Sequence, residues 1–256
     1  MYGGSHGVGA GTCKNLTVQN CEFGWIGGAL QHYKDGVPTR FGNAVEIYGG
    51  CEGYYVRDNY VYQCYDAGIT QQIRVSEDAS IPTTKVYAQK DVQYTGNVVE
   101  YSNYSIEYFL SRIPEGNPSY IKGFLIEDNL MWYSGQGFCE QRPDRTYNSS
   151  SHIKGWLGAS RNRASDYVTK NNLMVYSANT LVEAVSDLYN EDGSPSAPST
   201  SGNNYVQYIG SKFGAIAQDN AAVQKYNLGV IDYIGGLSDG TDTYWFAEAP
   251  DEEAEK

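Results

Sequence analysis

The stretch NAVEIYGGCEGYYVRDNYVYQCYDAGITQQ, residues 43–72, decides the fold, because its central pattern recurs along the chain. The pattern places a β-branched or aromatic residue three positions before an Asn and an apolar residue two positions after it. It reads VRDNYV at 56–61, YTGNVV at 94–99, IEDNLM at 126–131 and VTKNNL at 168–173, with a looser copy, LTVQNC, at 16–21. A repeating unit of this kind sets the architecture of a chain.

The repeated Asn residues are separated by 39, 38, 32 and 42 residues, from Asn20 through Asn59, Asn97 and Asn129 to Asn171. Within each unit, apolar and polar residues alternate over short runs rich in Val, Ile, Tyr and Phe, which is the period of strands. Short strands in a coil-sized repeat predict an all-β right-handed parallel β-helix of about six coils, with long loops on one side. We expect Asn59, Asn97, Asn129 and Asn171 to lie along one line parallel to its axis.

A second feature accompanies each Asn: a small residue followed by an apolar one, which comes nine or ten residues later. We expect these apolar residues to stack inward, as Ile69, Ile106, Phe138 and Leu181, and a second stack to contain Val56, Ile126 and Val168. Their sequence neighbours then face outward. The predicted outward row contains Gln31 or His32, Thr70 or Gln71, Glu107, Glu140 and Glu183. A slip of one residue in any coil reverses the face.

Glycoside hydrolysis needs two carboxyl groups, and a row of Glu on adjacent coils supplies them. We predict Asp66, Glu107 and Glu140 as catalytic residues that line one groove. Asp66, on the tight corner 65–68, is the candidate nucleophile or base, although Asp also caps turns. Glu107, between Ile106 and Tyr108, is the candidate acid, with a pKa raised by its apolar neighbours. The alternative is that each Glu is an ordinary solvated surface residue.

Further residues near this row are predicted to contact a sugar. Glu46 is expected to face outward from an adjacent sheet, and Arg142 and the Tyr side chains are expected to orient the substrate. The full set is Glu46, Gln71, Arg74, Arg142, His32 and Tyr108. For His32 in its loop, a solvated side chain is the alternative.

The composition narrows the class of partner. The net charge of −12 argues against nucleic acid, since Lys and Arg carry that binding. An excess of Tyr, 24 residues, suits sugar rings, which need a flat apolar face and a hydroxyl, although Tyr also favours strands. With five Cys, no CxxC pair and three His, no metal site is predicted, and the Cys are expected inside the coils. No cofactor is expected, apart from calcium if the protein is a lyase.

The ends of the chain suggest one domain and a tail. We expect residues 1–249 to form a single β-helix and 250–256, which are strongly acidic, to be disordered. No membrane-length apolar run or signal peptide is present. Because an open β-helix end exposes strand edges, we expect further coils, and any signal peptide, to precede residue 1. The protein is predicted to be extracellular or periplasmic, and monomeric.

The motifs HGVG (6–9), KNLTVQNCEFGWIGG (14–28), GNAVEIYGG (42–50) and YDAGITQQ (65–72) resemble those of bacterial right-handed parallel β-helix proteins, over roughly residues 5–185. That group resembles pectate lyases and β-helix glycosidases in fold. The resemblance implies an extracellular carbohydrate-active protein. A polysaccharide lyase ranks behind a hydrolase, because no Asp-x-Asp cluster that would hold calcium is evident. A non-catalytic sugar-binding or adhesion module, and a trimeric phage-type shaft with an apolar outer stripe, are the alternatives; no such stripe is clear in the sequence.

Overall fold

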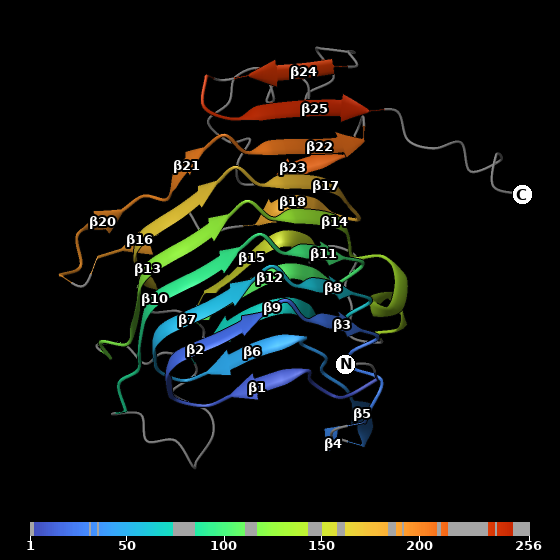
Figure 1. Cartoon of the computed structure of the whole chain (residues 1–256), viewed down its shortest axis with the longest axis vertical. Helices are drawn as coiled ribbons and strands as arrows, with labels where there is room; N and C mark the ends of the chain where they lie inside the picture. The colour runs from blue at the N-terminus through green and yellow to red at the C-terminus, as the bar shows by residue number, and fades with distance from the viewer. Residues whose placement is uncertain are drawn as a thin grey trace, which may run out of the picture.

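Three sheets of mostly parallel strands make up the chain, which is all-β as predicted (Figure 1). The computed structural model describes residues 3–30, 32–34, 36–73, 85–110, 117–142, 150–157, 162–183, 188–190, 192–208, 211–214, 235–238 and 240–247. The predicted acidic tail, 250–256, lies outside these residues. No helix in the described part of the chain is long and apolar enough to span a membrane.

Each sheet collects strands from along the whole sequence. Sheet 1 contains, in spatial order, β1 (Val8–Ala10), β6 (Val45–Tyr48), β9 (Ala67–Gln72), β12 (Tyr104–Leu110), β15 (Ser151–Leu157), β18 (Thr180–Glu183) and β23 (Lys212–Gly214). Sheet 2 contains β2 (Cys13–Gln19), β7 (Cys51–Arg57), β10 (Ala88–Thr95), β13 (Tyr120–Glu127), β16 (Asn162–Lys170), β19 (Leu188–Tyr189) and β20 (Pro195–Ser196), and β21 (Ser199–Ser201) pairs with β16. Sheet 3 contains β3 (Glu22–Gly24), β8 (Tyr60–Tyr62), β11 (Val98–Glu100), β14 (Leu130–Ser134), β17 (Leu173–Ser177), β22 (Asn204–Tyr208), β25 (Thr243–Ala247) and β24 (Gly235–Ser238).

The chain visits the three sheets in turn, so β6, β7 and β8 are followed by β9, β10 and β11, and each strand pairs in parallel with its counterpart one round earlier. Figure 1 shows the strands stacked from blue β1 to orange β22, with red β25 and then β24 at the top. This arrangement is compatible with a parallel β-helix. The antiparallel pairs are β19–β20, β24–β25 and a hairpin of β4 (His32–Lys34) and β5 (Val37–Thr39).

The interior is built from rows of apolar side chains in register. In sheet 1 the row contains Val45, Ile69, Ile106, Ile153 and Val182, all buried in one core. The prediction is therefore confirmed for Ile69 and Ile106. In sheet 2, Val56 aligns with Tyr94 and Ile126, as the repeat predicts.

Two predicted core positions, Phe138 and Val168, are wrong, and Leu181 is in the core as predicted but out of register with the stack. Phe138 lies in a 3₁₀ helix, η1 (Gly137–Gln141), which the chain forms between β14 and β15, so Ile153 takes its place in the stack. Leu181 is buried, but its neighbour Val182 is the one that aligns with Ile153. In sheet 2, Val168 pairs with Leu125, while Thr169 is the residue in register with Ile126.

Shortening Ile106 to Val should lower the free energy of unfolding by about 0.5–1.5 kcal/mol, because one methylene is lost from a fully buried position. The measurement is urea unfolding, compared with Leu173→Val on the exposed face of sheet 3. Equal changes for the two variants would contradict the inward placement of Ile106.

The Asn repeat forms a ladder of side-chain amides that joins successive coils. Each Nδ2 donates to the Oδ1 of the next Asn at about the same distance, 3.0 Å from Asn59 to Asn97 and 2.9 Å from Asn172 to Asn203. The full ladder is Asn59, Asn97, Asn129, Asn172 and Asn203, and it ends on the carboxylate of Asp242. Buried amides placed in this way satisfy one another and the backbone.

The alignment of Asn59, Asn97 and Asn129 is confirmed, and the fourth predicted member, Asn171, is one residue too early. Asn171 is an exposed turn residue with φ of 55°, and Asn172 occupies the ladder. Asn20 likewise has φ of 54°, and the backbone N–H of Cys21 donates to Asn59 Oδ1. Asn tolerates the left-handed region better than most residues, so it suits the turn position before the ladder.

Candidate functional site

A row of polar side chains crosses the outer face of sheet 1. The strand register aligns Glu46 with Thr70, Thr70 with Glu107, and Glu107 with Lys154. Each lies next to a core residue along its strand, so alternation turns it away from the core. We call this set the sheet 1 polar row: Glu46, Thr70, Glu107, Lys154 and Glu183.

The members of this row are tied to one another. Thr70 Oγ1 donates to Glu107 Oε2 at 2.9 Å, and Lys154 forms an ion pair with Glu183. Glu107 is 4% exposed and Lys154 5%, although both face away from the core. Buried charges on neighbouring strands must be compensated by partners, so the row is held in fixed geometry.

Glu46 is the more accessible end of the row. Its Oε2 accepts from Asn43 Nδ2 at 3.0 Å and lies 3.1 Å from His6 Nδ1. Glu46 belongs to sheet 1, in register with Thr70, and not to an adjacent sheet as predicted. The predicted first-coil members of the row, Gln31 or His32, are replaced at this position by Glu46. Gln31 lies outside the described residues, and His32 lies in the separate hairpin β4–β5, where only its backbone is described.

The spacing of Glu46 and Glu107, two carboxylates of this row, follows from the sheet. Glu46 and Glu107 are separated by two strand spacings, about 9.6 Å between their backbones. Inverting glycosidases hold their two carboxyl groups roughly 6.5–9.5 Å apart, with a water between the base and the sugar. The strand separation of this pair is close to the upper end of that range.

Asp66 lies elsewhere, in a cluster at the corner before β9. It is 8% exposed and forms an ion pair with Arg142. Arg142 also lies over the ring of Tyr65, at 5.6 Å, and Arg40 lies over the same ring at 4.3 Å. Phe138 packs edge-on against Tyr65 at 5.6 Å. We call Arg40, Tyr65, Asp66, Phe138 and Arg142 the corner cluster.

Glu140 is not in the sheet 1 polar row, where Lys154 takes the predicted place. It lies exposed in η1, and its Oε2 accepts from the Gly137 N–H at 3.0 Å, so it caps its own helix. Asp66 directly precedes Ala67, and Thr70 lies three residues, or about 10 Å, further along β9. Because Thr70 is in register with Glu107, Asp66 is at least that far along the strand from the polar row. The three predicted catalytic carboxyl groups therefore do not line one groove: Asp66 lies in the corner cluster, Glu107 in the polar row and Glu140 in η1.

Two predicted sugar contacts are interior residues. Gln71 is fully buried, and its Oε1 accepts from the hydroxyl of Tyr94. Tyr108 is also buried, with its ring 5.6 Å from that of Phe124. Neither side chain faces outward, because their positions in β9 and β12 carry them to the core side. Arg74 lies outside the described residues.

The outer face of sheet 3 is largely apolar, which the sequence prediction missed. One of its rows contains Tyr60, Val98, Leu130 and Leu173, with Glu22 and Asn204 at its two ends. A neighbouring row contains Tyr62, Trp132, Val175, Val206 and Trp245, and Glu100 interrupts it between Tyr62 and Trp132. We call the apolar and aromatic residues of these two rows the sheet 3 apolar face. The signal was available, because every apolar or aromatic residue in the first row directly follows a ladder Asn.

Four Tyr rings continue this surface at the ends of the strands. Tyr101 and Tyr133 stack with their centroids 5.2 Å apart, Tyr133 and Tyr176 are 5.5 Å apart, and Tyr176 and Tyr208 are 3.9 Å apart. All four are half-buried. An apolar face edged with hydroxyls is typical of surfaces that contact sugars or other proteins.

Within the described part of the chain, no three His, Cys, Asp or Glu side chains gather as a metal site requires. Comparison of the chain with family models, with curated proteins and with solved structures found no match. The function is therefore argued from the geometry of the polar row, the corner cluster and the sheet 3 apolar face.

Proposed function

We propose that the chain is a secreted carbohydrate-active protein with a right-handed parallel β-helix fold, and that it hydrolyses glycosidic bonds with Glu46 and Glu107. The observation that carries this proposal is the register, which puts both carboxylates on one outer row two strands apart. Their spacing supports an inverting mechanism. The substrate is a polysaccharide or oligosaccharide, so the protein acts outside the cytoplasm.

The two carboxyl groups have different surroundings, which suits different roles. Glu107 is buried among the strands of sheet 1, so we assign it as the general acid that protonates the leaving oxygen, and Thr70 holds its Oε2 in position. Glu46 is more accessible, beside Asn43 and His6, and we assign it as the base that activates water. In the corner cluster, Arg40 and Arg142 offer guanidinium groups, and Trp25 is half-exposed beside Phe138 for contact with a sugar ring.

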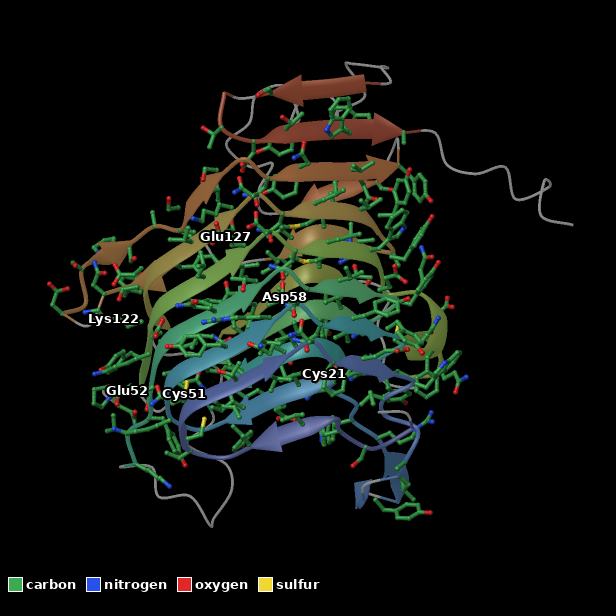
Figure 2. The ribbon with its side chains drawn as sticks, in the orientation of Figure 1. Cys21, Cys51, Glu52, Asp58, Lys122 and Glu127 are labelled. Atoms are coloured by element: carbon green, nitrogen blue, oxygen red, sulfur yellow. The ribbon has the colours of Figure 1, made fainter. Side chains whose placement is uncertain are left out.

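The test is hydrolysis of a panel of neutral polysaccharides, measured as the release of reducing ends. Glu107→Gln and Glu46→Gln should each lower turnover by about 100-fold or more, as expected for loss of a general acid or base. Glu52→Gln is the matched control, because Glu52 lies on the outer face of sheet 2 (Figure 2), paired with Lys14. Full activity of Glu107→Gln, with an unchanged melting temperature, would refute the assignment.

A non-catalytic binding module is the second candidate, and the sheet 3 apolar face favours it. Trp245 is 44% exposed there, and Tyr60 and Leu173 are also exposed. A binding module should be retained on an insoluble polysaccharide, lose that retention with Trp245→Ala and keep it with Glu107→Gln. A polysaccharide lyase would instead release unsaturated sugars, which absorb ultraviolet light. The same face would also suit the trimeric shaft, and sedimentation of the purified chain separates that assembly from the monomer that we propose.

A further inference from the structure

Two cysteines face each other across the first two coils. Cys13, at the start of β2, is in direct register with Cys51, at the start of β7. The N–H of Cys13 donates to the carbonyl of Gly50 at 3.1 Å, which fixes the two strands at this point. Cys51 is buried in the core, and Cys13 is partly buried and packs against the same core. Both thiols therefore lie on the inner face of sheet 2.

The backbone geometry suits a covalent bond. Adjacent strands lie about 4.8 Å apart, and disulfides join Cα atoms roughly 4.4–6.8 Å apart. Both cysteines are reduced in this structure. The bond requires rotation of two side chains and no movement of the strands.

The other cysteines are placed differently. Cys21 is exposed and lies beyond the far end of β2, so Cys21 and Cys51 are on opposite sides of the view in Figure 2. Its thiol donates to the carbonyl of Gln19 at 3.2 Å. Cys64 and Cys139 are fully buried near η1 and sheet 3. Among these cysteines, Cys13 is partly exposed to solvent and also has a cysteine, Cys51, in register on the next strand.

We propose that Cys13 and Cys51 form an oxidation site, in which a small-molecule disulfide converts the two thiols into a cross-link between the first and second coils. The Cys13 thiolate attacks one sulfur of the reagent, forms a mixed disulfide and releases one thiol. The Cys51 thiolate then attacks the Cys13 sulfur and releases the second thiol. The two protons lost by the cysteines leave with the two thiols, and the reagent accepts both electrons.

The cross-link has a mechanical consequence, because β2 is the edge strand of sheet 2. Within the described residues β2 pairs with β7. A bond from Cys13 to Cys51 closes a loop that contains the rest of that coil. It therefore ties β2 to β7 covalently and opposes local opening of this pair of strands.

The rate of the reaction should depend on pH in a predictable direction. Burial raises the pKa of Cys51 to about 12, and burial also raises the pKa of Cys13. Since the thiolate is the attacking species, oxidation should be slow at neutral pH and accelerate in mildly alkaline buffer. A more oxidising reagent does not remove the need for a thiolate.

The experiment is incubation of the full chain with oxidised glutathione in mildly alkaline buffer, alkylation of remaining thiols, and peptide mapping by mass spectrometry without reduction. The expected product links the peptides that contain Cys13 and Cys51, with Cys21 alkylated. Hydrogen exchange of β2 amides should then slow by about tenfold or more. Adding a reductant should restore the original exchange.

Variants separate this site from unspecific oxidation. Cys51→Ser should stop at the mixed disulfide on Cys13, whereas Cys139→Ser should still give the Cys13–Cys51 link. Two results on the folded, unaltered chain would overturn the proposal. In one, Cys13 and Cys51 both stay reduced and are alkylated. In the other, Cys13 carries glutathione and the link to Cys51 does not form. A Cys13–Cys21 link as the main product would also overturn it. None of these outcomes depends on the proposed hydrolase activity.

Discussion

Replacing Asn172 with Ala is expected to lower the free energy of unfolding by about 4 kcal/mol, because four hydrogen bonds worth about 1 kcal/mol each are lost. The Oδ1 of Asn172 accepts from the backbone N–H and the side-chain amide of Asn129, both at 3.0 Å. Its Nδ2 donates to the carbonyl of Ile126 and to Asn203 Oδ1. All of these groups are buried, so water does not replace the missing partner.

The adjacent residue provides the control for this prediction. Asn171 is exposed, with φ of 55°, which Gly adopts without strain. Asn171→Gly should therefore change stability by well under 1 kcal/mol. Urea unfolding of the two variants is the measurement. If Asn171→Gly lowered the free energy of unfolding more than Asn172→Ala, the ladder would run through Asn171, as the sequence repeat predicted.

Acid is expected to remove about 3 kcal/mol of stability through one buried imidazole. His152 lies in the core of sheet 1, where Nδ1 is 2.9 Å from Ser105 Oγ and Nε2 is 3.0 Å from the carbonyl oxygen of Val175. Because a carbonyl only accepts, Nε2 carries the proton, and Nδ1 accepts from the Ser105 hydroxyl. The neutral ring is therefore the form that the folded protein holds.

Burial lowers the pKa of His152 to about 4, from an ordinary value of 6.5. The unfolded chain thus binds one more proton between these values, so the folded state is favoured as pH rises through this window. The full contribution is present above pH 6.5 and is lost as the pH falls toward 4. At about 1.4 kcal/mol for each unit of pKa, the total is about 3 kcal/mol.

The test compares His152→Gln with the unaltered chain by urea unfolding between pH 4 and 7. Gln stays neutral, so the difference in stability between the two proteins should shrink by about 3 kcal/mol as the pH is lowered across the window. Asn171→Gly, which removes no titratable group, is the control and should keep the pH dependence of the parent. Parallel curves for His152→Gln and the parent would show that this imidazole does not titrate with folding.

The sequence alone determined the strands and much of the core. Alternation is a local property, so residues such as Ile69 and Ile106 were assigned to the interior before any strand was paired. The first part of the Asn ladder followed for the same reason, since Asn59, Asn97 and Asn129 stand at the same place in each local pattern. Glu107 was correctly placed on an outward position, because its neighbours Ile106 and Tyr108 are both core residues.

Only the tertiary structure decided which residues meet across coils. The pair Asn171 and Asn172 offers two equivalent amides, and the hydrogen bonds to Asn129 and Asn203 select the second. The chain forms the helix η1 between β14 and β15, so Lys154 and not Glu140 occupies the next position of the polar row. The alternation of residues within a strand does not reveal how long the segment between two strands is. Asp66 and Arg142, 76 residues apart, pair for the same reason: the stacking of coils brings them together, and no local pattern encodes it.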